Sequence, residues 1–233
     1  MLRENTLIIN NDRRMKLQKP IVDLVADIIR RRIINGEMGN NLKLSTRQLS
    51  EELGVSRTPV REAIRRLESE GLIELLPRRG FTVKEYSIDE IDEIYEVRRI
   101  LEIKAISLAC KNIKKKELNK IEKLAQELNK ELQSKKSDIL TIQELNKKLH
   151  FAIYEISNNE TLCQIIKNLW HRVSGLLITI FSTPHRREEI PHEHKAIIKA
   201  LKERNEKDCI RALKKHMEIT EEILFKHSKR ILE

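Results

Sequence analysis

The sequence predicts a mainly α-helical protein with an N-terminal winged helix-turn-helix and a C-terminal, all-α bundle of six antiparallel helices. Three observations lead to this fold class. Only 6 glycines and 5 prolines occur in 233 residues, which favours helices over a turn-rich β fold. Two short helical patterns meet at Gly54 within residues 45–83, and two brief apolar runs follow them. From residue 88 almost to the end, apolar residues recur at helical spacing.

The first predicted elements are a flexible arm and two helices. Residues 1–19 are polar and basic, without clear periodicity. Residues 20–36 predict a helix that starts at a proline and ends near a glycine, the residue that commonly follows a helix. Ser45 and Gln48 have the spacing of a capping box, which marks the start of a second short helix.

A third helix and a β-hairpin complete the N-terminal part. Ser56 or Thr58 can cap the helix, and Gly71 ends it. Residues 72–76 and 81–85 predict the two strands of a wing. The buried stripe of the helix is expected at Val60, Ala63, Ile64 and Leu67.

The C-terminal part is predicted to be helical throughout. A boundary at residues 85–87 divides the chain into a winged helix-turn-helix over residues 20–86 and a bundle over residues 87–233. Ser87 and Glu90 form a second capping box at the start of the bundle. The helical pattern predicts helices at 88–110, 116–134, 138–157, 160–181, 188–204 and 207–230.

The overall composition indicates a protein of the cytoplasm with a polyanionic partner. The net charge is +10, which suits such a partner, although a solvated lysine-rich surface would give the same value. Cys110, Cys163 and Cys209 are isolated, which suggests a reducing compartment and no zinc cluster built on cysteines. The N-terminus lacks an apolar signal core, and the longest apolar run, residues 175–181, is too short to span a bilayer. We therefore expect no membrane partner.

Double-stranded DNA is the partner that the N-terminal part predicts. Three arginines recur every four residues on the third helix, at 57, 61 and 65, so they share one face. Arginine there can form bidentate hydrogen bonds with guanine or with phosphates, whereas the alternative is a merely solvated helix face. Serine and threonine hydroxyls at the helix start suit phosphate oxygens. Arg78 and Arg79 at the wing tip can enter the minor groove, and Arg47 on the preceding helix can reach the DNA backbone.

The tract Val55-Ser56-Arg57-Thr58-Pro59-Val60-Arg61-Glu62-Ala63 resembles the signature of the GntR family of bacterial transcription regulators. The resemblance covers Leu42 to Val83, less than a fifth of the 233-residue chain. It implies a homodimer on a short palindromic operator. By this resemblance, the DNA contacts are expected at Arg47, Ser56, Arg57, Thr58, Arg61 and Gly80.

Histidines form the most distinctive pattern of the C-terminal part. Asn146 and His150 are four residues apart on one helix face, and His194 and His216 lie on the apolar stripes of two other helices. Imidazole nitrogens with an amide oxygen would suit Zn²⁺, Ni²⁺ or Mn²⁺ with open coordination positions. The alternative is that each histidine is a hydrogen-bonded core residue.

Residues 88–230 resemble the helical FCD effector-binding domain of FadR-type GntR regulators, in its shorter, VanR-like variety. The family resemblance implies a divalent metal held by an aspartate and three histidines, which helps to hold a carboxylate effector. Asn146 stands where the aspartate is expected, so weaker metal retention is expected here. The matching pieces are Val97-Arg98-Arg99-Ile100-Leu101-Glu102, Leu149-His150, Glu193-His194-Lys195-Ala196-Ile197 and Lys215-His216.

Arg98 and Arg172 are the candidate contacts of the effector. Arg98 lies on an apolar stripe, and a buried guanidinium needs a partner. Either an internal acid, such as Glu102, or the carboxylate of the effector can supply it. Arg172 sits in the middle of a helix beside Trp170 and is expected near the same cavity.

These observations favour a regulator over an enzyme. GxSxG, GxGxxG and P-loop sequences are absent, and the histidines lack the HExxH spacing of a metal-dependent hydrolase. A DNA-binding dimer with a purely architectural bundle is the other alternative, although the inward-facing histidines and Arg98 count against it. The sequence thus predicts a homodimeric transcription repressor controlled by a small organic acid.

Overall fold

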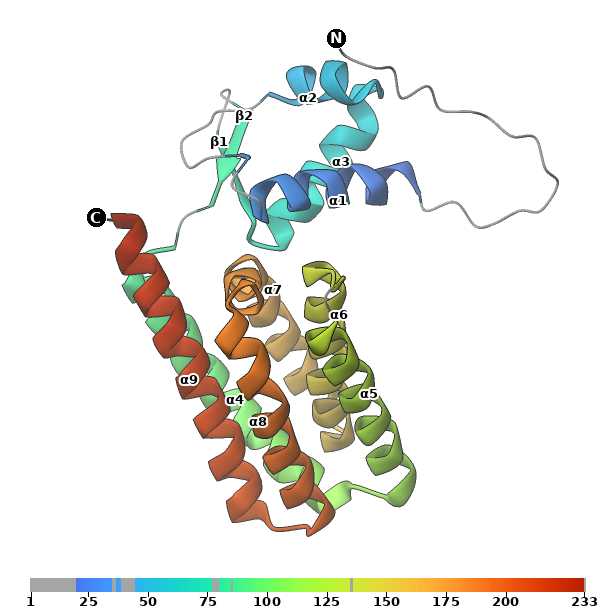
Figure 1. The fold of residues 1–233 in the computed structure, drawn as a ribbon, viewed down its shortest axis with the longest axis vertical. Coiled ribbons are helices and arrows are strands. Elements are labelled where there is room, and N and C mark those ends of the chain that lie inside the picture. Colours follow the sequence, from blue (N-terminus) through green and yellow to red (C-terminus); the bar gives the residue numbers. More distant parts are fainter. Residues whose placement is uncertain are drawn as a thin grey trace, which may run out of the picture.

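The computed structural model describes residues 20–34, 37–38, 45–76, 80–84, 86–134 and 136–232. A small N-terminal domain lies across one end of an elongated helical bundle (Figure 1). The N-terminal domain contains α1 (Ile21–Ile34), α2 (Thr46–Leu53), α3 (Arg57–Ser69), β1 (Ile73–Leu76) and β2 (Gly80–Val83). The bundle contains α4 (Ile88–Asn112), α5 (Lys115–Gln133), α6 (Ile139–Tyr154), α7 (Glu160–Ser182), α8 (Pro184–Lys202) and α9 (Glu206–Leu232).

The N-terminal domain has the predicted order of helix, turn, helix and wing. The capping box of Ser45 and Gln48 is present, and Gly54 closes α2 in the left-handed conformation, with φ of 65°. Ser56 is the N-cap residue of α3, without a side-chain capping bond. The two wing strands pair antiparallel, with Ile73 opposite Val83. All four residues of the predicted α3 stripe are buried: Val60, Ala63, Ile64 and Leu67.

The bundle packs α4 along α9, and α5 packs against both α6 and α8 (Figure 1). Its capping box at Ser87 and Glu90 is present. Two helix bounds of the bundle differ from the prediction by more than two residues. The third helix of the bundle, predicted over residues 138–157, ends at Tyr154, and a 3₁₀ turn over Glu155–Ser157 follows it. Helix α8 begins at Pro184, four residues before the expected start, because proline fits the first helical turn.

Tyr86 joins the two domains at the top of the bundle. Its side chain is 7% exposed, and its hydroxyl lies between the carbonyl oxygens of Gly71, at 3.2 Å, and Arg172 on α7. Burial raises the pKa of Tyr86 to about 12, so the hydroxyl keeps its proton and remains a donor. Arg31 on α1 also pairs with Asp138 at the start of α6, at 2.8 Å. The N-terminal domain is therefore attached to the bundle at α6 and α7.

The structure confirms the predicted fold class, a winged helix-turn-helix followed by an all-α bundle. Three predictions fall outside the described residues: the arm over residues 1–19, the helix end at Gly36 and the wing tip at residues 77–79. No described helix is long and apolar enough to cross a membrane.

Candidate functional site

The exposed face of α3 gathers most of the residues predicted to contact DNA. The turn at Gly54 sets the start of α3 beside α2, and the buried stripe of α3 holds that helix against α1. This packing leaves the opposite face of α3 in solvent. Five predicted contact residues are exposed there or on α2: Arg47, Ser56, Arg57, Thr58 and Arg61.

The arginines of α3 fall into two groups. No ion pair joins Arg57, Arg61 or Arg65 to any other described residue. Arg66, one residue further on, pairs with Asp23 of α1 and lies 3.4 Å from Glu70. The first group therefore keeps its five donors per side chain available for an anionic partner, whereas Arg66 helps to hold the domain together.

The two other predicted contacts have different surroundings. Arg47 pairs with Glu51 one turn later, at 2.8 Å, so contact with a phosphate would compete with an exposed ion pair of little net stability. Gly80 opens β2 with φ of 91°, a left-handed conformation that favours glycine. Arg78 and Arg79 lie outside the described residues.

Three helices of the bundle bring His150, His194 and His216 together. One ring nitrogen from each lies within 4.8 Å of the other two. The Nε2 atoms of His150 and His194 are 3.2 Å apart. Asn146 is buried one turn before His150 on the same face of α6. The helical spacing of these residues in the sequence predicted that they would meet inside the bundle, and the structure shows that they do.

Tyr154 and Glu193 fix the orientation of two of the three histidines. The Tyr154 hydroxyl donates to Glu102 at 2.5 Å, so its oxygen is left to accept the proton of His150 Nδ1, 3.1 Å away. His216 Nδ1 lies 2.5 Å from a Glu193 oxygen and donates to that carboxylate. In the His150 ring the proton is on Nδ1, so Nε2 carries a lone pair, and the Glu193 carboxylate holds the His216 ring by its Nδ1. Such partners are typical of histidines that hold a metal.

The charges around the cluster explain why its groups keep these states. Burial, and then the neighbouring His216, lower the pKa of both His150 and His194 well below 6.5, so both rings are neutral. Burial alone would raise the pKa of Glu193, but hydrogen bonds from Arg186 and His216 outweigh it and lower the pKa to about 2. His150 and His194 are therefore neutral imidazoles beside the ionised Glu193 carboxylate, and neutral rings are the form that binds a metal.

Arg98 occupies a buried position beside this cluster. Its Nε donates to Glu102 at 2.8 Å, so the internal partner considered from the sequence is present. Its guanidinium lies 4.6 Å from the ring centre of Tyr95 and 4.8 Å from that of Trp170. Burial would lower the pKa of Arg98, but Glu102 raises it above its ordinary value, so the charge is retained. Its Nη1 has no hydrogen-bond partner within the described part of the chain.

Arg172 is the predicted site residue that the structure does not bring to the cluster. Its side chain is exposed, whereas Trp170, two residues earlier on α7, is 5% exposed and lies 5.1 Å from the His150 ring. Residues two apart on a helix point to nearly opposite sides, which explains the difference. The sequence analysis missed Tyr154, Glu193 and Arg186. The four-residue spacing from His150 could have revealed the first.

Two family models match this chain, one for each domain. The model described as "Bacterial regulatory proteins, gntR family" matches residues 22–83, and the FCD domain model matches residues 93–219. The chain belongs to the GntR family. Its two matched regions coincide with the winged helix-turn-helix and with the bundle that carries the histidines. The FadR-type resemblance drawn from the sequence is therefore confirmed.

Curated GntR relatives resemble this chain over most of its length. The HTH-type transcriptional regulator McbR of Escherichia coli is 33% identical over 84% of this chain and 88% of its own. The regulator YdhC of Bacillus subtilis is 33% identical over 81% of this chain and 82% of its own. The solved structure of E. coli McbR/YncC has a TM-score of 0.70, with 29% identity, and covers 90% of this chain and 99% of that one. The family is one of DNA-binding transcription regulators rather than enzymes.

Proposed function

We propose that this GntR-family protein is a homodimeric repressor that binds a short palindromic operator and responds to a small carboxylate bound in its bundle. The observation that carries the proposal is the contrast within α3. Arg57 and Arg61 are exposed and unpaired among the described residues, whereas Arg66 on the same helix is held by Asp23. Unpaired arginines at the start of an exposed helix suit phosphates and guanine edges in the major groove.

The exposed apolar residues of α4 support a homodimer. Val97 and Ile100 are 45% and 65% exposed, although the rest of the helix contributes a large part of the bundle core. Burial of these side chains against a second copy would remove apolar surface from water. A twofold dimer would present two α3 helices to the two halves of a palindrome.

The histidine cluster supports a divalent metal. The donor set fits, since Glu193 and Tyr154 hold the His216 and His150 rings through Nδ1 and leave Nε2 of each ring for a metal, and His194 places its own Nε2 3.2 Å from that of His150. Zn²⁺, Ni²⁺ or Mn²⁺ would each accept imidazole nitrogens, and a bound ion would offer open positions to a carboxylate. Asn146 is a neutral donor, so it adds no negative charge to the site.

Arg98 supports the carboxylate nature of the effector. Glu102 uses its Nε, while the buried Nη1 has no partner among the described residues. A buried donor without a partner costs free energy, which a ligand carboxylate would recover. Arg172 is exposed, so a role in effector binding would require a rearrangement of α7.

Operator binding by two matched variants tests the DNA-binding proposal. A duplex selected by the wild-type protein from random sequences serves as the operator. Arg61→Ala should weaken binding by about 1–3 kcal/mol if the side chain contacts a base, or reduce the salt dependence by about one ion if it contacts a phosphate. Arg66→Ala is the control, because it removes an arginine of the same helix that already has partners. Equal effects of the two substitutions on operator affinity would contradict the assignment.

Melting temperatures test the sensor part of the proposal. Divalent metals, a chelator and small organic acids are added separately to the wild-type protein, and operator binding is measured in parallel. A metal or acid that binds the folded state raises the melting temperature by mass action. If none of them changes either melting or operator affinity, the bundle is an architectural dimerisation domain instead.

A further inference from the structure

Glu62 is an acidic side chain on the exposed face of α3, among the residues expected to contact DNA. It is exposed, and the buried stripe of α3 lies on the other side of the helix. Residues four apart share a face, so Glu62 lies one turn beyond Thr58, as Arg61 does beyond Arg57. A rise of 1.5 Å per residue places the Cα of Glu62 about 8 Å along the helix from that of Arg57. Glu62 is therefore in the N-terminal half of α3, the part of such a helix that contacts base edges.

The carboxylate of Glu62 makes no ion pair or hydrogen bond with the part of the chain that the structure describes. Arg66, four residues later, has the spacing that favours a pair within one helix. Its guanidinium instead pairs with Asp23 and lies 3.4 Å from Glu70. The negative charge of Glu62 is thus not neutralised within the N-terminal domain.

A carboxylate on the DNA-contacting face has a restricted choice of favourable partners. It repels the phosphates of a duplex, so it weakens binding unless it accepts a hydrogen bond from a base. In the major groove, cytosine presents only a donor, the N4 amino group. Adenine places an acceptor beside its amino group, guanine presents two acceptors, and thymine presents an acceptor and a methyl group. Since a carboxylate only accepts, cytosine is the base whose edge fits Glu62.

We propose that Glu62 is a specificity-determining residue that accepts a hydrogen bond from N4 of a cytosine in each half of the operator. The arginines of α3 offer only donors, which suit guanine, so the helix holds complementary groups for the two bases of a G·C pair. The inference rests on the proposed operator binding by α3 and adds to it the base that one side chain of this helix selects.

Selection of operators from random duplexes tests the assignment. The wild-type protein, Glu62→Ala and Glu62→Gln each select sequences from the same pool, and fluorescence anisotropy then measures their affinities. The wild-type protein should select a cytosine at one position of each half-site. Replacing that C·G pair by T·A in one half-site should weaken its binding about fivefold to 150-fold. Glu62→Ala should bind both duplexes equally, and Glu62→Gln should prefer adenine at this position, because glutamine pairs with N6 and N7 of adenine.

Glu68→Ala is the matched control for the loss of charge. Glu68 is also exposed on α3 and has no ion pair among the described residues, but it lies about 9 Å further toward the C-terminal end of the helix. Both alanine variants lose one negative charge, so both should bind a scrambled duplex more tightly than the wild-type protein. Only Glu62→Ala should lose the preference for cytosine. Alanine favours a helix at least as well as glutamate, so α3 is retained in both variants.

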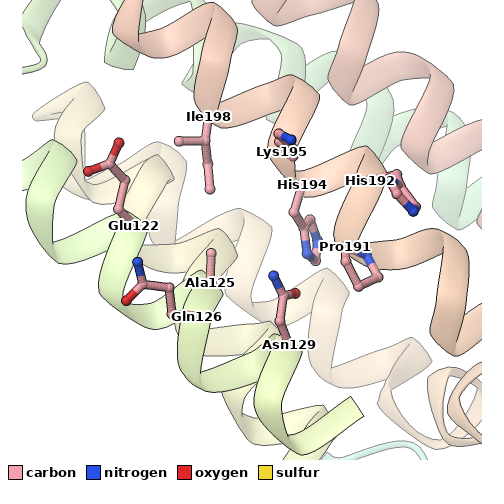
Figure 2. Close-up of a pocket in the computed structure, with 9 residues that line it drawn as sticks. All are labelled: Glu122, Ala125, Gln126, Asn129, Pro191, His192, His194, Lys195 and Ile198. Carbon is pink, nitrogen blue, oxygen red and sulfur yellow. The ribbon is translucent and has the colours of Figure 1, made fainter. Parts of the chain in front are cut away.

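The proposed sensor lies in another part of the molecule, so it can fail independently of this inference. Figure 2 shows a cavity of the bundle between α5 and α8, beside His194. No residue of α3 lines this cavity, so the substitutions leave it unchanged.

Three results would overturn the role of Glu62. They are a wild-type selection without a cytosine in the half-site, a preference for cytosine that Glu62→Ala retains, and an equal loss of that preference in Glu68→Ala. In each of these cases the wild-type protein still selects an operator, so the proposed DNA binding stands. If the wild-type protein selects no sequence from the pool, operator binding itself fails, and the role of Glu62 fails with it.

Discussion

Gly71 lies against the backbone of α7, so Gly71→Ala should weaken the attachment of the two domains. A Cβ atom at this position would lie 2.4 Å from the carbonyl oxygen of Arg172 on α7, where ordinary contacts begin at 3.4 Å. The backbone would have to move by about 1 Å, the difference between these two distances. That movement would break the bond between Tyr86 and Arg172, at a cost of about 0.5–1.5 kcal/mol.

The backbone of Gly71 adds a second cost. Its φ of +69° is left-handed, which costs a residue with a side chain about 1–2 kcal/mol. Gly54→Ala is the matched control, because Gly54 has φ of +65° and a Cβ there would meet no atom within 4 Å. We expect Gly54→Ala to destabilise the N-terminal domain by about 1–2 kcal/mol, and Gly71→Ala by about 1.5–3.5 kcal/mol.

Hydrogen exchange followed by mass spectrometry measures both effects. The slowest amides of α3 report the free energy of opening of the N-terminal domain, and the amides around Arg172 report the contact at α7. Only Gly71→Ala should accelerate exchange around Arg172. If both variants destabilise α3 equally and exchange in α7 is unchanged in both, the close contact between Gly71 and α7 does not exist in solution.

Three further predictions concern the interior of the bundle. Glu102→Ala should lower the free energy of unfolding by about 3–5 kcal/mol, because it leaves the buried charge of Arg98 without its partner; urea denaturation measures this, and a loss below 1 kcal/mol would contradict the pairing. Glu193→Gln should weaken zinc binding about tenfold to a hundredfold, since it removes the carboxylate that orients a ligand histidine; competition with a chromophoric chelator measures the affinity, and an unchanged value would refute that role. In protein freed of metal by a chelator, His150 and His194 resist protonation when folded but bind protons near pH 6.5 when unfolded. The free energy of unfolding should therefore fall as the pH drops below about 6.5, by up to about 1.4 kcal/mol per pH unit for each ring. If urea denaturation gives the same free energy of unfolding at pH 7 and pH 5, these rings are not buried and neutral.

Local sequence signals predicted the elements of this fold well where caps and periodicity agreed. The capping boxes at Ser45 and Ser87 placed the starts of α2 and α4 correctly. The start of α8 was placed too late, because Thr183 caps it without a side-chain bond and the charged first turn shows little apolar periodicity. The start of a helix is thus predictable where a side chain caps it.

The site was predictable only in part, because spacing gives the face of a helix but not its partners. His150, His194 and His216 were identified from their apolar stripes, and the structure brings them together. Glu193 was missed as the partner of His216, since that contact joins α8 to α9 and depends on how the two helices pack. Contacts between distant helices carry no signal in one sequence.

Helix α7 provides the physical link between the histidine cluster and the N-terminal domain. Trp170 contacts the His150 ring and donates to Glu102 at 2.8 Å, while the carbonyl of Arg172 accepts from Tyr86. These two contacts lie within one turn of a single helix, so a displacement of the Trp170 ring that moves the helix also moves the attachment of the N-terminal domain. Packed helices shift between discrete positions by about 1–2 Å. Gly71 lies so close to the Arg172 carbonyl that such a shift of α7 toward it would displace the backbone at Gly71. If a ligand binds at the cluster, as proposed, a small movement of α7 would suffice to change how the N-terminal domain is held.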